Sequence, residues 1–272
     1  MPRTPAVAGQ FYPADPADLM TMISDCTPTV SARRRALGVL CPHAGYIFSG
    51  PTAGATLAEV DVPRTVVLLT PSHHYSSPPC ALWTGGEWKT PIGQAAIHEK
   101  LTRALAELPA VTADDRPHLS EWSGEVIVPF LLFHRRDVRI AVICITPGAG
   151  DKLLKELGEG IAEALKRCGE SDALVVASSD MSHESGPDAA ERVNRQDPPA
   201  IARMEALDAP GLLELLRDSR VSMCGALPAA AMMAGVAARG GTRGELIHRA
   251  TSADSEFGSG SYIVGYAGMI FY

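Results

Sequence analysis

The sequence lacks the features that would place it at a membrane or outside the cell. The longest bland apolar stretch, residues 226–238, is rich in alanine and ends at Arg239. It is shorter than the roughly 20 residues that a membrane-spanning helix needs, so it predicts a buried helix. The first residues contain no apolar core behind a basic start, as a secretory signal would. These absences predict a cytoplasmic protein without membrane contact.

Positive charge and nucleotide-binding motifs are scarce as well. Lys plus Arg number 24 against 31 for Asp plus Glu, which gives a formal net charge of −7. There is no run of five or six like charges and no basic stripe, so nucleic acid is not an expected partner. The sequence contains no Walker-type loop, no GxGxxG and no internal repeat. Nucleotide binding therefore has no support from a motif.

The six cysteines form no CxxC pair. Several lie within apolar runs, which predicts small reduced core residues rather than a disulfide framework. Cys41 and Cys144 in particular are expected to be buried. With 272 residues, of which 46% are hydrophobic and 6% aromatic, the chain is expected to form a single domain over residues 1–272.

Short apolar runs alternate with helical patterns along the chain. Runs buried on both faces and separated by helices predict an α/β domain with a central, largely parallel sheet flanked by helices. The expected strands are residues 36–42, 65–71, 139–147, 173–180 and 261–272, and the expected helices are residues 15–26, 51–59, 97–108, 124–134, 151–168 and 227–239.

Polar loops follow three of the expected strands. "CPHAGYIFSG" contains His43, "PSHHYSS" contains His73, and "SSDMSHESG" contains Asp180 and His183. A single loop histidine is more often a turn residue than a ligand, but strand ends on a common edge converge in space. Neutral imidazoles at such density suit a transition metal.

Cys224, in "VSMCGALP", precedes a glycine and the start of the Ala-rich helix. The N-terminus of a helix lowers the pKa of a thiol and favours the thiolate. Cys224 is thus the cysteine expected to be reactive or to bind a metal, with a small buried core residue as the alternative.

Six motifs in collinear order resemble the Memo family, whose bacterial and archaeal members are often encoded beside the other proteins of the AmmeMemoRadiSam system, including a radical SAM protein. The resemblance covers nearly the whole chain. The motifs are "PAVAGQFYPADPADL", "PHAGYIFSGPTAG", "LLTPSHH", "SSDMSH", "MCGALP" and "TSADS" through "VGYAGM".

This resemblance implies a fold similar to class III extradiol dioxygenases, which hold non-haem Fe(II) at strand ends. It implies that His43, His73 and Cys224 bind the metal. Asp180 and His183 match positions beside the ligands that act as acid or base. Fe(II) is the expected metal, with Cu or Zn as alternatives, since two imidazoles and a thiolate suit all three.

One motif departs from the family pattern. In "HLSEWSGEVIVPFL", His118 and Glu121 match, but Trp122 stands where relatives commonly have a histidine. We expect these three residues and His74 to line the substrate pocket. The large indole removes a titratable group and fills volume, so it predicts an altered substrate or a lost catalytic step.

Three functions are compatible with these residues. The first is a metal-dependent oxidoreductase that acts with O2 on an unknown small molecule. The second is a non-catalytic module whose histidine-lined pocket accepts a peptide or a protein. The third is a metal-binding or redox-buffering protein without an organic substrate. The complete ligand trio favours the first and third, and Trp122 weakens the first.

Overall fold

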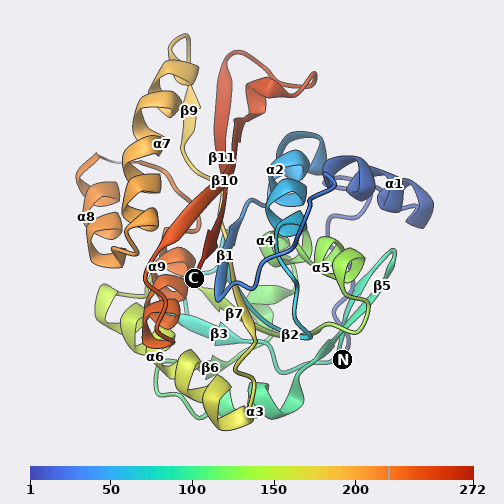
Figure 1. The fold of residues 1–272 in the computed structure, drawn as a ribbon, viewed down its shortest axis with the longest axis vertical. Helices are drawn as coiled ribbons and strands as arrows, with labels where there is room; N and C mark the ends of the chain where they lie inside the picture. The colour runs from blue at the N-terminus through green and yellow to red at the C-terminus, as the bar shows by residue number, and fades with distance from the viewer. Residues whose placement is uncertain (220) are drawn as a thin grey trace.

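The protein is built around one largely parallel sheet, as its computed structural model shows for residues 1–219 and 221–272 (Figure 1). The middle strands are mutually parallel and almost entirely buried. In spatial order they are β1 (Gly38–Cys41), β8 (Leu174–Ser178), β2 (Thr65–Pro71) and β7 (Arg139–Ile145). Their Val, Ile and Leu content suits strands that are covered on both faces.

Antiparallel strands extend this sheet on both sides. β11 (Tyr262–Phe271) pairs with β1, and β10 (Gly244–Thr251) pairs with β11. On the other side β3 (Cys80–Leu82) pairs with β7, and β6 (Thr112–Ala113) pairs with β3. Shorter strands pair at the margins, namely β4 (Trp88–Thr90), β5 (Gly93–Ile97) and β9 (His183–Ser185).

Helices cover both faces of the sheet and bury a separate core on each (Figure 1). One face carries α3 (Glu99–Ala106), α6 (Asp151–Cys168), α8 (Ala209–Ser219) and α9 (Ala226–Ala238), and α7 (Ala189–Glu205) packs against α8 and β11. The other face carries α1 (Pro16–Cys26), α2 (Tyr46–Ala58), α4 (Trp122–Glu125) and α5 (Val128–His134).

The Ala-rich segment forms α9, which lies close against α6. A β-carbon at Gly158 of α6 would approach the carbonyl oxygen of Ala231 to 2.4 Å. Glycine is therefore required at this position for the two backbones to touch. This close packing fixes the position of α9 against α6, and Cys224 lies just before α9.

The predicted α/β class with a central, largely parallel sheet is confirmed. Some boundaries were wrong: α2 begins at Tyr46 and continues through Pro51, and the helix predicted over residues 124–134 is divided into α4 and α5. α7 was not predicted because Pro198 and Pro199 lie inside it. β10 was not predicted because its residues are only half-buried and carry no continuous apolar run.

Two further expectations concern the burial of cysteines and the presence of membrane-spanning helices. Cys41 and Cys144 are fully buried, as predicted. Within the part of the chain that the structure describes, no helix combines the length and the apolar character that crossing a bilayer requires.

The carboxyl ends of β1, β8 and β2 lie at one edge of the sheet. Cys41 at the end of β1 pairs with Ser178 at the end of β8, and Leu69 of β2 pairs with Ala177. The loops that contain His43, His73 and Asp180 therefore leave the sheet side by side, at the edge where ligands collect in such folds.

Candidate metal centre

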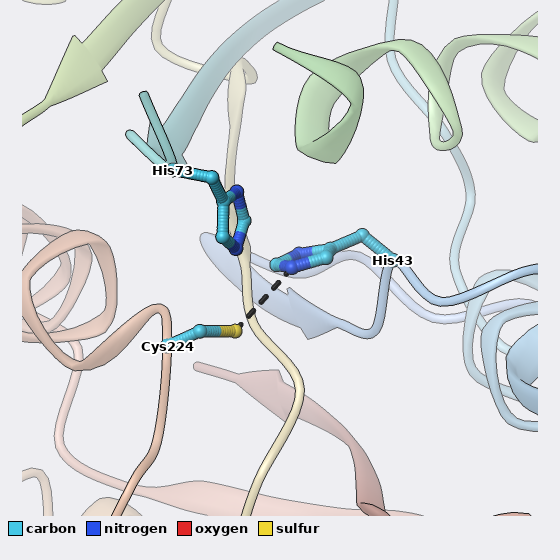
Figure 2. A group of neighbouring side chains, drawn as sticks. All are labelled: His43, His73 and Cys224. Carbon is cyan, nitrogen blue, oxygen red and sulfur yellow. Dashed lines mark hydrogen bonds between the residues drawn. The ribbon is translucent and has the colours of Figure 1, made fainter. Parts of the chain in front are cut away.

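His43, His73 and Cys224 meet above this edge of the sheet, and their side chains point toward a common space (Figure 2). One potential ligand atom from each residue lies within 4.8 Å of the others. The Cys224 Sγ lies 3.3 Å from the His43 Nε2, and the two imidazole rings meet edge to face at 5.4 Å between centroids. The three residues thus form a group that can hold a metal ion.

The His43 ring is oriented by Ser178. The Ser178 hydroxyl donates its hydrogen to the Ser123 carbonyl at 2.7 Å, so it accepts a hydrogen bond from the His43 Nδ1, which also lies at 2.7 Å. This arrangement places the proton on Nδ1 and leaves the Nε2 lone pair facing Cys224. Burial lowers the pKa of His43, which favours the neutral imidazole that a metal requires.

The His73 ring is oriented by a carboxylate. Glu121 accepts hydrogen bonds from the His73 Nδ1 at 2.8 Å and from the His73 backbone N–H at 2.7 Å. Burial raises the pKa of Glu121, but the hydrogen bonds from His73 and from the Ser123 N–H outweigh this effect and lower the pKa to about 2. The ionised carboxylate fixes Nδ1 as the protonated nitrogen and leaves Nε2 available.

Cys224 lies just before α9, and its Sγ accepts a hydrogen bond from the Asp180 backbone N–H at 3.2 Å. Burial, followed by the negative charge of Asp180, raises the pKa of Cys224 well above its ordinary value. The predicted lowering of this pKa by the helix N-terminus is therefore wrong. A raised pKa disfavours a free nucleophilic thiolate, whereas a bound cation displaces the thiol proton itself.

Asp180 and His183 have separate hydrogen-bond partners. The Asp180 carboxylate accepts the His43 backbone N–H at 2.8 Å. The His183 Nδ1 donates to the Ser222 carbonyl at 3.0 Å, and the His183 backbone N–H donates to the Ser222 hydroxyl at 2.8 Å. The His183 tautomer is thus set by Ser222, which leaves Nε2 as an acceptor. An acid or base role for Asp180 and His183 stays a prediction.

Trp122 lies at the site, as its position in the sequence predicted. Its indole stacks on the His73 ring with 4.2 Å between centroids and 16° between planes. His74 meets the indole edge to face at 5.3 Å, and Phe11 lies 5.7 Å from it. Trp122 therefore packs against both neighbouring histidines and not in the core away from them. His74 and Trp122 stay predicted pocket residues.

His118 and Glu121 do not line a pocket as predicted. The His118 side chain is buried between Trp83 and Trp88, and its Nε2 donates to the Ala81 carbonyl at 3.0 Å. Burial lowers the pKa of His118 to about 4. The predicted substrate contact of His118 is therefore not compatible with this geometry, and Glu121 faces His73 instead of an open space.

The sequence interpretation gave no role to Ser178 and Ser222. Ser178 stands at the last position of β8 inside the quoted motif "SSDMSH". A buried serine at a strand end beside a candidate ligand was a usable signal. Ser222 carried none, since only the fold brings residue 222 beside His183.

The donor set fits a divalent transition metal. Both imidazoles have Nδ1 engaged in a hydrogen bond outside the group, and the His43 Nε2 contacts the Cys224 thiol. Such outward hydrogen bonds are the usual support for metal-binding histidines. The His73 side chain is 25% exposed, which leaves the His73 side of the group open to solvent.

Comparisons with known proteins point to one family over nearly the whole chain. The family described as Memo-like protein matches residues 3–270. A MEMO1 family protein of Methanopyrus kandleri is 38% identical over 286 residues, which cover 100% of this chain and 99% of the relative. A MEMO1 family protein of Methanothermobacter thermautotrophicus is 35% identical, with 98% and 99% covered.

A solved structure supports the fold alone. An uncharacterized protein from Escherichia coli K12 superposes with a TM-score of 0.55 at 14% identity, covering 86% of this chain and 99% of that one. The family match over nearly all residues and the full-length identities carry the assignment: the chain belongs to the Memo family.

Proposed function

We propose that the protein binds one transition metal ion through the Nε2 atoms of His43 and His73 and the Sγ of Cys224, and that it acts as a metal-dependent oxidoreductase on a small molecule. Fe(II) is the proposed metal, with Cu or Zn as alternatives. The observation that carries the proposal is the convergence of three donor atoms within 4.8 Å of one another.

The composition of the group favours reaction over a purely structural role. Structural zinc sites normally have four protein ligands, whereas three ligands leave positions for water, O2 or a substrate. Such an ion would supply one-electron and O2 chemistry at the open positions. The exposed side of His73 is where a small molecule would enter.

The residues of this chain would bind, orient and exchange protons. Ser178 and Glu121 keep both imidazoles in one tautomer and one orientation. His183, with Nδ1 donated to Ser222, presents Nε2 as a proton acceptor. Trp122 covers one face of His73 and excludes water from it, and together with His74 it would contact the substrate.

Metal analysis of protein purified without oxygen tests the proposal. We expect about one equivalent of metal, and loss of it in His43→Ala and Cys224→Ala. O2 consumption by the iron-loaded protein across a panel of phenols and other small molecules then tests the oxidoreductase step. Full metal stoichiometry in both variants would show that the ion is held elsewhere.

Binding without catalysis is the second candidate. His74 and Tyr75 are exposed, and His74 lies edge to face against Trp122. These side chains would offer an aromatic surface to a peptide or protein. Retention of a bound peptide after chelation of the metal would favour this function. We also propose the other AmmeMemoRadiSam proteins as partners and the cytoplasm as the location.

A further inference from the structure

The N-terminal segment, residues 3–12, lies against the part of the chain that orients His73. Arg3 pairs through its backbone with Glu87 and Lys89, so the segment is attached beside β4. Its side chain is only 1% exposed and forms a 2.7 Å ion pair with Glu125. Burial of this guanidinium requires compensating contacts, because its desolvation is costly.

The Arg3 guanidinium joins both ends of the turn formed by residues 118–125. Its Nε donates to the His118 carbonyl at 2.8 Å, and its Nη2 donates to the Glu121 carbonyl at 2.7 Å. The third contact is the ion pair of Nη1 with the carboxylate of Glu125. The planar fork of arginine satisfies three acceptors at once, which the single ammonium of a lysine does not.

The Glu125 side chain in turn binds further groups of the N-terminal segment. Its carboxylate accepts the backbone N–H groups of Ala6 at 2.8 Å and Val7 at 2.9 Å, and the Tyr12 hydroxyl at 2.7 Å. The Arg3–Glu125 pair is therefore fully hydrogen-bonded, the condition under which a buried pair is tolerated. The segment and the turn are held together as one unit.

This unit controls the position of Glu121. Arg3 holds the Glu121 carbonyl, and the Glu121 side chain accepts both the backbone N–H and the Nδ1–H of His73. The chain of contacts runs from Arg3 through the backbone of Glu121 to the imidazole, with every link at 2.7–2.8 Å.

The same segment reaches the other histidine loop. The Phe11 carbonyl accepts the backbone N–H of Tyr46, three residues after His43, at 2.8 Å. The Phe11 ring packs 5.7 Å from Trp122, which itself stacks on His73. The N-terminal segment thus supports the edge and the face of the His73 ring and the start of α2 behind His43.

We infer that residues 3–12 form a positioning element of the candidate metal centre, in which Arg3 and Glu125 are positioning residues that act on His73 through Glu121. The inference rests on the proposed metal site. No contact joins Arg3 to His73 or Cys224, so the effect of Arg3 is transmitted through Glu121. The packing of Phe11 on Trp122 is a second contribution of the segment.

Metal affinity of Arg3→Met tests the inference, with Co(II) as the probe because its visible spectrum reports the ligand geometry. Changes in the groups that orient metal-binding histidines typically cost about 10–100-fold in affinity. We expect a loss at the lower end of this range, no larger than that of Glu121→Gln, together with a changed absorption band. Arg3→Lys, which keeps the charge opposite Glu125 but not the fork, is expected to recover part of the affinity.

His98→Gln serves as the matched control. His98 is 5% exposed and pairs with Glu170 at 2.9 Å, and the pairing of Ile97 with Ile140 places it near the start of β7, at the opposite edge of the sheet. We expect His98→Gln to bind Co(II) with unchanged affinity and spectrum at a comparable loss of Tm. A similar decrease in affinity in the control would reduce the role of Arg3 to general stability and overturn the inference.

Tyr12→Phe provides a second, milder variant if Arg3→Met does not fold. It removes one hydrogen bond to Glu125 and is expected to weaken Co(II) binding several-fold. Wild-type affinity and spectrum in the folded variants would overturn the inference. Failure of the wild-type protein to bind any metal would instead overturn the proposed function.

A readout without metal separates the two ideas further. ¹⁵N NMR of the histidine rings should show the proton of His73 on Nδ1, slowly exchanging in the wild-type protein. In Arg3→Met we expect faster exchange or a mixture of tautomers at His73, while the His43 signal changes less. An unchanged His73 signal would contradict the inference whatever the metal data show.

Discussion

His43 and His73 offer the same ring to the same centre, but their surroundings are opposite. The His43 residue is 2% exposed and is oriented by a neutral hydroxyl, whereas the His73 side chain is 25% exposed and is oriented by an ionised carboxylate. A charge-assisted hydrogen bond is roughly twice as strong as a neutral one. The exposed His73 thus has the stronger hydrogen bond. This bond compensates for the surrounding packing that His73 lacks and that the buried His43 receives.

The origin of the difference lies in the strands that the loops follow. β1, ahead of His43, has parallel β8 on one side and antiparallel β11 on the other, and Ser178 comes from the end of β8. His73 follows β2 in a loop that runs toward the surface, and its support comes from a separate turn before α4. A solvent-exposed position is thereby combined with a fixed imidazole, as the proposed open metal site requires.

The largest effect is expected from removing the ligands themselves. His43→Ala, His73→Ala and Cys224→Ala should each lower the bound metal at least about tenfold, because each deletes a donor and not merely its support. Metal analysis after purification without oxygen measures this loss, with His74→Ala as the control. If His74→Ala lost the metal and His73→Ala kept it, the assignment of the ligand between these neighbours would be reversed.

The next largest effect is expected for Glu121→Gln. The amide keeps the shape but loses the charge that raises the basicity of the His73 imidazole, so metal affinity should decrease by about tenfold. Ser178→Ala serves as the matched comparison at His43. A larger loss for Ser178→Ala than for Glu121→Gln would contradict the view that the carboxylate is the stronger support.

The same variant changes the pH dependence of stability. The folded-state pKa of Glu121, about 2, is lower than its ordinary value of 4.5, so its contribution is fully present above pH 4.5 and is lost as the pH falls toward 2. The contribution corresponds to roughly 3 kcal/mol. Urea unfolding of both proteins at several pH values measures it: the wild type should lose more stability than Glu121→Gln over this interval.

The centre of the sheet could be predicted because its strands are continuous apolar runs, a pattern that requires burial on both faces. The grouping of His43, His73 and Cys224, the proposed ligands, followed from the family motifs and from the convergence of strand ends. The groups that orient the rings were harder to predict. Ser178 and Glu121 form hydrogen bonds with His43 and His73 across 135 and 48 residues. The strand-end position of Ser178 signals that it lies near the site, but no local pattern pairs either residue with its histidine.

His118 and Cys224 show where the sequence misled. His118 belongs to the same motif as Glu121, but the short 3-10 turn at Arg116–His118 directs its ring into the core between two tryptophans. The N-terminus of α9 predicted a lowered thiol pKa for Cys224, but burial and the nearby Asp180 charge outweigh the helix. Neither effect can be read from sequence neighbours.

A smaller effect is expected for Ser178→Ala. It removes a neutral hydrogen bond worth roughly 1 kcal/mol, which corresponds to about a fivefold change in metal affinity if the whole loss falls on binding. The ring stays buried, so its pKa should remain below 6.5. NMR of the His43 ring checks this: we expect a neutral imidazole with mixed tautomers, and a ring that becomes charged above pH 6.5 would contradict it.

The smallest effect on metal binding is expected at Trp122, although this residue distinguishes the two histidines most clearly. The indole covers a face of His73 and touches none of the Nδ1 contacts, so Trp122→His and Trp122→Phe should change metal affinity by no more than a few-fold.

The two variants should differ in the volume of the pocket beside the proposed metal site and in whether it holds a titratable group. Trp122→Phe keeps an apolar ring over His73, while Trp122→His enlarges the pocket and adds a group that titrates near pH 6.5. Any O2-dependent turnover of the iron-loaded protein should then rise only in Trp122→His, with a pH dependence that follows the new imidazole. Equal turnover in both variants would mean that pocket volume, and not proton transfer, separates this chain from relatives with histidine at this position.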